Sequence, residues 1–398
     1  MRRFCTILIG LVFFSAGLFK LIDPVGSSLI VRSYLEFFHL GFLGGLSGVA
    51  AFVLSSLEAL TGLALLRGAW RRITAKVSMA LIGFFTVITF ILMLAQPKMD
   101  CGCFGEAFHL SHTQTFIKNI VLCALAAGAF IPLPKTSSKK NATIILSVIT
   151  LFTGIYSLFF LPLWDFTAFG AGDRLYDTAH PFPQLKAAEP GFIYEKNGTQ
   201  KEFSLDALPD STWTFVSVAD VPEAETPANL VPIAAPDGSP MDSVLLHGKV
   251  LAISAYEPEK LSEKDWGRAA ELLASAAENG TQPVLLTASA EIENLLQDLE
   301  TVQRMQLLMV SYFSDHKVLM TFNRSNGGAV LLDEGLIVEK WSSNGYPTAV
   351  KMQKIAAEGP GNLIIGSSVP GRICLVFFMM AAIIISLFSY RNRRKRIV

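Results

Sequence analysis

Long apolar runs, separated by short polar segments, dominate the first 165 residues of the chain. Five runs are each close to the ~20 residues that cross a bilayer as a helix, and a sixth stands alone near the C-terminus. The runs cover residues 4–22, 46–66, 75–95, 115–133, 142–163 and 370–390. This pattern predicts a multi-pass membrane protein with six transmembrane helices.

The hydrophilic segment between the fifth and sixth runs has the periodicity of a soluble domain. Residues 165–190 are rich in glycine, proline and polar side chains, which is typical of a linker. After the linker, apolar strand runs alternate with helical spacing. The predicted elements are a strand at 249–256, a helix at 263–279, a strand at 283–287, a helix at 290–303, a strand at 306–312, a short helix near Val318 and a hairpin of 329–332 with 336–341. Their order predicts an α/β layered domain over residues 191–369.

The loop between the first two runs has a pattern of its own. Between residues 23 and 45, apolar side chains interleave with Arg32, Glu36 and His39. This spacing favours an amphipathic helix that lies at the membrane surface.

Composition and charge support the membrane assignment and orient the chain. Of the 398 residues 51% are hydrophobic and 17% charged, with a mean hydropathy of +0.44. A formal net charge of zero argues for neither a nucleic-acid partner nor an acidic substrate. Basic residues gather at alternate ends of the runs: Arg2, Arg3, Arg67, Arg71, Arg72, Lys76, Lys135, Lys139, Lys140, Arg391, Arg393, Arg394, Lys395 and Arg396. Because short cytoplasmic loops are enriched in Lys and Arg, we expect both termini in the cytoplasm and the large domain outside it.

The first run also has the outline of a cleavable signal peptide, because Arg2 and Arg3 precede it. Its apolar stretch continues past the small residues Ser15, Ala16 and Gly17, where a cut would fall. We therefore expect a retained helix.

Two of the cysteines stand apart from the others. The five are Cys5, Cys101, Cys103, Cys123 and Cys374, and three of them lie in apolar runs, where a thiol is usually a small buried side chain. Cys101 and Cys103 lie in a predicted outward loop, on either side of Gly102. A disulfide between them would close a small ring, and strain makes such a bond easy to reduce. The pair is a candidate redox pair; the alternative is that it pins a tight loop at the membrane surface.

The same loop also contains His109 and His112. Together with Cys101 and Cys103 they have the composition of a Cys2His2 metal site. The spacing is not a common zinc pattern, and histidines at the mouth of a helix are more often interfacial polar residues. Metal binding is therefore kept as a third hypothesis.

Glu58 lies near the middle of the second run, and Lys20 lies near the outer end of the first. A carboxyl group at that depth costs ~3 kcal/mol to insert, so by default it indicates a functional site. Lys20 can pair with Glu58 or extend to the interface. The alternative for Glu58 is a protonated packing residue.

The soluble domain lacks the residues for thiol chemistry. After its first predicted core strand the sequence is Glu257-Pro258-Glu259-Lys260, and no cysteine occurs between Cys123 and Cys374. The domain is therefore better interpreted as binding or positioning a partner.

Three motifs in the N-terminal third carry a family resemblance: Gly17-Leu18-Phe19-Lys20-Leu21-Ile22-Asp23-Pro24, Glu58-x3-Gly62 and Asp100-Cys101-Gly102-Cys103-Phe104-Gly105. With them, residues 1–134 resemble the DoxX-like and MauE (methylamine-utilisation) membrane proteins. The resemblance implies a four-helix membrane bundle. It also implies that Cys101 and Cys103 form a redox pair, working beside a thioredoxin-like partner that helps to form disulfides in exported proteins.

The C-terminal domain resembles a degenerate thioredoxin fold. Its segment Arg324-Ser325-Asn326-Gly327-Gly328 precedes a strand at the place where thioredoxins have a cis-proline. That proline is absent here, as is a Cys-x-x-Cys motif, which argues against independent redox activity of this domain.

The expected fold is a membrane all-α bundle carrying an extracytoplasmic, thioredoxin-like α/β domain. The expected parts are a four-helix domain at 1–134, a fifth span at 135–164, a linker at 165–190, the soluble domain at 191–369, a sixth span at 370–390 and a basic tail at 391–398.

The first functional hypothesis is a thiol:disulfide relay in a bacterial inner membrane, with the large domain in the periplasm. Cys101 and Cys103 would exchange electrons with an exported dithiol or thioredoxin-like protein, and Glu58 and Lys20 would serve a quinone or proton path. The second hypothesis is a non-catalytic membrane scaffold that recruits exported proteins.

Overall fold

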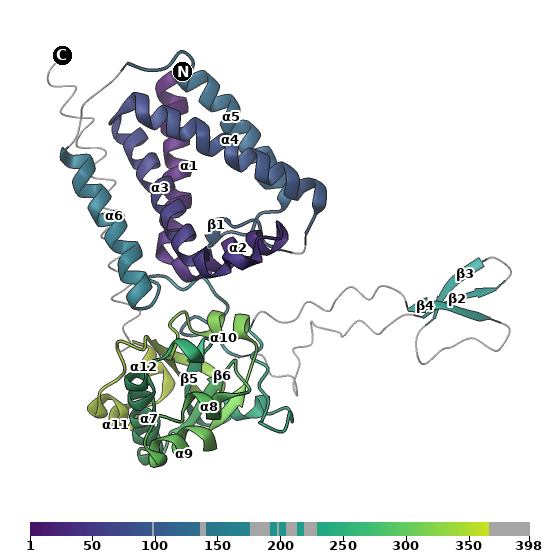
Figure 1. Ribbon diagram of the computed structural model, residues 1–398, viewed down its shortest axis with the longest axis vertical. Helices are drawn as coiled ribbons and strands as arrows, with labels where there is room; N and C mark the ends of the chain where they lie inside the picture. Colours follow the sequence, from purple (N-terminus) through teal and green to yellow (C-terminus); the bar gives the residue numbers. More distant parts are fainter. Residues whose placement is uncertain are drawn as a thin grey trace.

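A helical bundle and an α/β domain make up most of the computed structural model (Figure 1). The structure describes residues 1–97, 99–135, 141–175, 192–196, 199–203, 213–218 and 229–365. The predicted sixth span and basic tail, and most of the predicted linker, lie outside the described residues.

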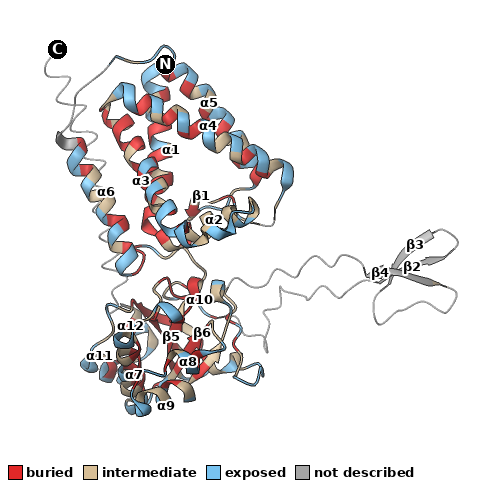
Figure 2. Cartoon of the chain, in the orientation of Figure 1, coloured by how far each residue is buried: buried red, intermediate tan, exposed pale blue. Residues whose placement is uncertain are grey.

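Four helices of the described part are long and apolar enough to cross a membrane. They are α1 (Arg2–Ile22), α3 (Ser47–Arg67), which continues the 3-10 helix η1 (Gly41–Leu46), α4 (Arg71–Ala95) and α5 (His112–Phe130). They coincide with the first four apolar runs, so these four of the predicted helices are confirmed. Large apolar side chains of these helices, such as Ile73, Val87 and Leu94, are exposed, as expected of helices surrounded by lipid. Figure 2 shows exposed residues along α4 and α5.

Helices α1 and α3 pack backbone against backbone, and glycine permits this. A Cβ atom on Gly17 would lie 2.7 Å from the carbonyl oxygen of Ser55, and one on Gly62 would overlap the backbone of Phe14. Small residues at such crossings let membrane helices approach closely. The close approach brings Lys20 of α1 and Glu58 of α3 together.

The predicted surface helix is present as α2 (Pro24–Phe37), and it lies between the bundle and the soluble domain. Asp23 caps it by accepting a hydrogen bond from the backbone N–H of Gly26 at 2.9 Å. Val25 and Leu29 pack against the core of the soluble domain. The helix therefore has protein on more than one side, because its apolar residues are divided between two faces.

Helix α6 (Asn141–Phe159) corresponds to the fifth apolar run. Its apolar part, Thr143–Phe159, is shorter than the four spanning helices. Leu146 packs with Phe14, Leu18 and Leu63 of α1 and α3, which places α6 on the outside of that pair.

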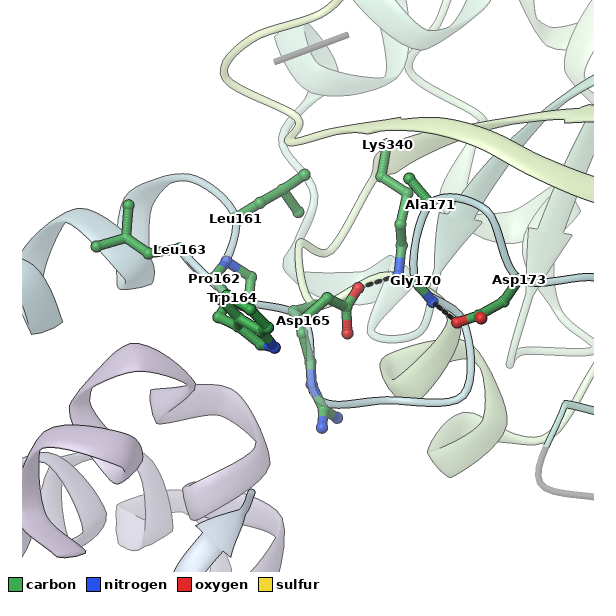
Figure 3. A pocket seen from close by; sticks show the side chains of 10 residues that line it. Leu161, Pro162, Leu163, Trp164, Asp165, Gly170, Ala171, Asp173 and Lys340 are labelled. Carbon is green, nitrogen blue, oxygen red and sulfur yellow. Dashed lines mark hydrogen bonds and ion pairs between the residues drawn. The ribbon is translucent and has the colours of Figure 1, made fainter. Parts of the chain in front are cut away.

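The segment that follows α6 joins the soluble domain earlier than the predicted linker implied. Phe169 and Leu175 are buried in the domain core. Lys340 binds the Asp165 carboxylate at 2.7 Å and the carbonyl oxygen of Phe169 at 2.9 Å, at the edge of a cavity of about 230 Å³ (Figure 3). Residues 165–175 are therefore part of the domain, because they supply apolar side chains that its core needs.

The soluble domain is built on a mixed sheet with the strand order β7-β6-β5-β8-β9 among the described residues. Strands β5 (Lys249–Ala255), β6 (Gln282–Thr287) and β7 (Ser311–Phe313) run parallel to one another. Strand β8 (Gly328–Asp333) pairs antiparallel with β5, and β9 (Leu336–Trp341) pairs antiparallel with β8. A second, antiparallel sheet has the order β3-β2-β4, formed by β2 (Phe192–Lys196), β3 (Thr199–Phe203) and β4 (Thr214–Val218).

Helices cover both faces of the mixed sheet, whose strands are buried (Figure 2). Helix α7 (Glu263–Glu278) begins with a capping box of Ser262 and Asp265 and packs on one face through Trp266. The other helices of this domain are α8 (Ile292–Leu295), α9 (Thr301–Met309), α10 (His316–Phe322), α11 (Ala349–Ala357) and α12 (Pro360–Ile365), with 3-10 turns η3 (Asp242–Leu245) and η4 (Pro258–Lys260). Leu319 and Phe322 of α10 pack on the opposite face.

Most predicted elements of this domain are confirmed, and one stretch is wrong. The predicted helix at 290–303 is replaced by the short α8 and by α9, and residues 306–309 of the predicted strand continue α9. Only Ser311–Phe313 pair with β6. The apolar residues at 306–309, which suggested a strand, instead lie on α9, where Leu307 is buried. Short apolar runs of this kind suit either a helix or a strand.

Candidate functional site

The two loop cysteines are free thiols whose Sγ atoms lie 4.0 Å apart. They stand between α4 and α5, and Cys103 begins the short strand β1 (Cys103–Glu106). Cys101 is only 3% exposed, and Cys103 is partly buried. Gly102 has a φ of +57° and no room for a Cβ beside Ile30 of α2, so the turn that brings the thiols together requires glycine.

The surroundings of the two thiols shift their pKa values in opposite directions. The hydrogen bond from Cys101, aided by the positive charges of Lys118 and Lys20, lowers the pKa of Cys103, although burial acts against it. The same hydrogen bond, together with burial, raises the pKa of Cys101. Of the two thiols, Cys103 therefore loses its proton the more easily.

Tyr34 of α2 lines the cavity beside the thiols. Its hydroxyl donates to the carbonyl oxygen of Cys101 at 2.5 Å and lies 4.0 Å from the Cys101 sulfur. Burial and the neighbouring thiols raise the pKa of Tyr34, so it stays a phenol and a hydrogen-bond donor.

Lys20 and Glu58 form a buried ion pair inside the bundle. The Lys20 ammonium lies 2.8 Å and 3.1 Å from the two carboxylate oxygens, with side chains 11% and 4% exposed. Lys20 also lies over the ring of Phe85, at 5.6 Å from its centroid. Of the two positions the sequence left open for Lys20, pairing is the one present in the structure.

A cavity of about 540 Å³ joins the thiols to this ion pair. Cys101, Cys103, Lys20, Glu58 and Lys118 all line it. Most of the remaining wall is apolar and comes from α1, α2, α3, α4 and α5, with Phe13, Leu54, Phe85, Ile88 and Leu122 among its residues. The predicted pairs are thus two parts of one site.

The structure does not assemble the alternative metal site. His112 lies 3.1 Å from the carbonyl oxygen of Pro97, and His109 lies near the Asp100 and Glu106 carboxylates at 3.7 Å and 3.9 Å. No group of three or more metal-ligating side chains is found among the described residues. The two histidines instead contact other residues of the segment that joins α4 and α5.

The soluble domain contacts the loop through one buried arginine. Arg324 lies 2.9 Å from the Asp23 carboxylate, with side chains 2% and 3% exposed, and 3.7 Å from Glu106 at the end of β1. The segment that contains Arg324 is itself held at the end of β5. Asn326 hydrogen-bonds both the N–H and the carbonyl oxygen of Glu257, at 3.0 Å and 2.7 Å. The end of the sheet at Glu257 therefore faces the membrane domain.

Sequence reasoning did not find Lys118, Tyr34 or the Asp23–Arg324 pair. Lys118 left a signal, because a charged residue within the apolar run at 115–133 has to be paired or bordered by a cavity. Tyr34 and Arg324 left none, since each acquires its role through a contact with a distant segment.

Residues 2–132 match the sequence model of the family described as "Methylamine utilisation protein MauE". This match confirms the resemblance of the N-terminal region to MauE. Residues 189–222 match a domain of unknown function (DUF8463).

A curated relative, Protein TlpB of Flavobacterium psychrophilum, is 28% identical over 160 residues. The aligned region is 39% of this chain and 42% of the relative, so the chain spans about two fifths of the relative's length. No solved structure matches the chain.

Proposed function

We propose that the protein is a membrane thiol:disulfide oxidoreductase, in which Cys101 and Cys103 exchange electrons with an exported dithiol protein. The observation that carries the proposal is the geometry of the pair. Two free thiols lie 4.0 Å apart, at the polar end of a cavity that also contains a buried Lys–Glu pair. A purely structural loop needs neither the cavity nor the cations that favour one thiolate.

The asymmetry of the thiols suits exchange with a dithiol. When a substrate thiolate attacks Cys101 in the disulfide form, Cys103 leaves as the thiolate, and a low thiol pKa makes it the better leaving group. The second substrate thiolate then attacks the substrate sulfur of the mixed disulfide and releases Cys101, whose raised pKa returns it to the thiol form. The substrate dithiol loses two electrons and two protons. The electrons reduce the Cys101–Cys103 bond, one proton goes to Cys101, and the other goes to water because Cys103 stays a thiolate.

The rim of the loop offers a place for such a substrate. Asp100, Phe108 and His109 are exposed on the loop that carries the pair. The soluble domain lies on the same end of the bundle (Figure 1). A protein chain approaching the thiols would therefore meet both the loop and the soluble domain.

We assign the soluble domain a thioredoxin-like fold with a positioning role. The support is its strand order, the helix α7 after β5, and the 324–328 segment that binds the end of β5 before β8 begins. Without cysteines it cannot exchange electrons, and its docking through Arg324 orients it over the loop.

We also propose an inner-membrane location, with the thiol loop on the periplasmic side. The basic turn from Arg67 to Arg71 and the N-terminal Arg2, which donates to the carbonyl oxygen of Ile131, support a cytoplasmic position for that end of the bundle. The compartment facing the loop would then be oxidising, as a disulfide pair requires.

A redox titration tests the function. A variant with Cys5, Cys123 and Cys374 each changed to Ala keeps only the pair. It is reconstituted in lipid nanodiscs, equilibrated in dithiothreitol mixtures of graded potential and tagged with a maleimide polymer. We expect two tags per chain under reducing conditions and none under oxidising ones.

The control and the contrary outcome are both defined. The further variant Cys103→Ser must carry one tag at every potential, because no partner thiol remains. If the variant that keeps only the pair still carries two tags after treatment with the strong thiol oxidant diamide, the pair does not form a disulfide. The thiols would then belong to a non-catalytic scaffold, which the buried docking of the soluble domain would still serve.

A further inference from the structure

The cavity beside the cysteine pair has a polar end and an apolar body. Cys103, Lys118 and the Lys20–Glu58 pair gather at one end. Apolar side chains line most of the rest of the roughly 540 Å³. This size lies within the roughly 300–1,000 Å³ of small-molecule sites. The shape of the wall fits a ligand with a small polar head and a long apolar tail.

The apolar end opens toward the surface that lipid covers. Leu40, Phe84 and Ile91 border the cavity and are 39%, 53% and 38% exposed in the bundle. Phe84 and Ile91 belong to α4, one of the helices long enough to cross the membrane. A ligand dissolved in the bilayer can therefore reach the thiols without crossing water, whereas a protein substrate approaches from the loop rim.

The cations at the polar end favour an acceptor that becomes negatively charged as it is reduced. The Lys118 ammonium lies over the ring of Phe104, the residue next to Cys103, at 5.1 Å from its centroid. Asn119 follows it on α5 and donates to the Thr89 hydroxyl at 3.1 Å, and both side chains also line the cavity. Hydrogen-bond donors and cations in a water-poor site stabilise negative charge on an oxygen atom.

We propose that this cavity binds a lipid-soluble quinone, with its ring against Cys103 and Lys118, and that the quinone oxidises the cysteine pair. The inference rests on the proposed thiol:disulfide function and names the electron acceptor of that same site. The isoprenoid tail occupies the apolar body and leaves between α4 and the η1 segment.

The reaction balances with the groups present. The Cys103 thiolate forms a bond to the Cys101 sulfur, and the two electrons released pass to the quinone ring. The Cys101 thiol proton goes to one quinone oxygen, and a proton from the Lys20 ammonium, which water restores, goes to the other. The products are one disulfide and one quinol.

The test uses the variant in which Cys5, Cys123 and Cys374 are changed to Ala, reconstituted in nanodiscs without oxygen. Decylubiquinone is the probe. Disulfide formation is followed by maleimide tagging and quinol formation by absorbance. We expect loss of both tags with one quinol formed per disulfide. The variant Leu54→Trp fills the cavity, and we expect it to raise the decylubiquinone concentration for half-maximal oxidation by at least about tenfold, equivalent to 1.4 kcal/mol of binding.

Two controls distinguish an effect on the cavity from damage to the fold or to the thiols. Val53→Trp adds the same side chain at the neighbouring exposed position, which does not line the cavity, and should leave oxidation unchanged. Oxidation of Leu54→Trp by the water-soluble oxidant diamide should match that of the parent, which shows that the thiol loop is intact.

The outcomes distinguish this inference from the function on which it rests. If diamide oxidises the pair but decylubiquinone does not, or if Leu54→Trp and Val53→Trp respond alike, the quinone site is wrong and the cavity holds only lipid. If neither oxidant forms the disulfide, the proposed function itself is wrong.

Discussion

The membrane domain and the soluble domain both have apolar cores, but they differ in the side chains that they expose. In the soluble domain the strands β5, β6 and β8 are buried and apolar, and charged residues lie mainly outside. In the bundle, apolar side chains such as Val87 and Leu94 face outward, and the charged Lys20 and Glu58 lie inside. Charges enter a membrane helix at a high cost, so their inward position marks a candidate functional site.

The two domains also differ at the ends that face each other. The membrane domain presents a thiol pair beside an open cavity. The corresponding end of the soluble sheet has Glu257 tied by backbone hydrogen bonds to Asn326, and no thiol. Among the described residues, the thiols therefore belong to the membrane domain, and the soluble domain contributes a buried contact through Arg324.

The largest effect is expected where the bundle depends on glycine. Gly17→Leu places a side chain into the backbone of α3, and we expect a loss of at least about 3 kcal/mol of stability or no folded protein, because the helices cannot separate without disrupting the Lys20–Glu58 pair. Thermal unfolding and gel filtration in detergent measure it. Gly83→Leu, at an exposed α4 position with nothing within 4 Å, is the matched control and should behave as the parent. Equal behaviour of the two variants would refute tight α1–α3 packing.

The second-largest effect is expected at the contact between the two domains. Arg324→Met leaves the buried Asp23 carboxylate without its cation, and we expect about 3–5 kcal/mol of destabilisation. In a double-mutant cycle with Asp23→Asn, the combined loss should be smaller than the sum. Arg268→Met is the control, because its ion pair with Asp265 is about one-third exposed and is worth at most about 1 kcal/mol. A cycle with no coupling between positions 23 and 324 would mean that the domains do not dock through this pair.

A smaller effect concerns the pH dependence of Cys103. A lowered thiol pKa keeps the reactive thiolate present at pH values below the ordinary value of about 8.5, so alkylation by iodoacetamide should persist there and fall only as the pH drops through the lowered pKa. Lys118→Met removes a nearby positive charge and should move this profile to higher pH by about one unit. Lys76→Met, at an exposed position at the other end of α4, should not move it. Mass spectrometry of the alkylated peptide gives the rates, and an unshifted Lys118→Met profile would remove Lys118 from the site.

The smallest effect is expected at the turn that follows β5 in the soluble domain. Glu259 follows Pro258 in an exposed turn and contacts neither thiol. We expect Glu259→Ala to change the rate of disulfide exchange by less than about twofold, a value typical of surface substitutions within ±0.5 kcal/mol. A large loss of exchange with the thiol pair intact would return a chemical role to this domain and overturn the comparison.

Much of the fold could be predicted because membrane helices and regular strands leave strong local patterns. The four spanning helices, the helix α2, strands β5 and β6 and the hairpin of β8 and β9 all lie where hydrophobic spacing and turn residues placed them. The two-residue turn between β8 and β9, Glu334 and Gly335, has φ values of 50° and 71°, as an acidic residue followed by glycine allows. The stretch from 290 to 312 failed because its short apolar runs suit either a helix or a strand.

The sequence alone determined which side chains were candidates: the thiols of Cys101 and Cys103, and the membrane charges Lys20 and Glu58. Residue type and depth in an apolar run carry that information, since both are local properties. Only the tertiary structure decided that these four groups line one cavity, that Lys118 and Tyr34 join them, and that Arg324 holds the soluble domain over the loop. Those relations join segments up to 301 positions apart, and no local pattern records which distant side chain will fill a given space.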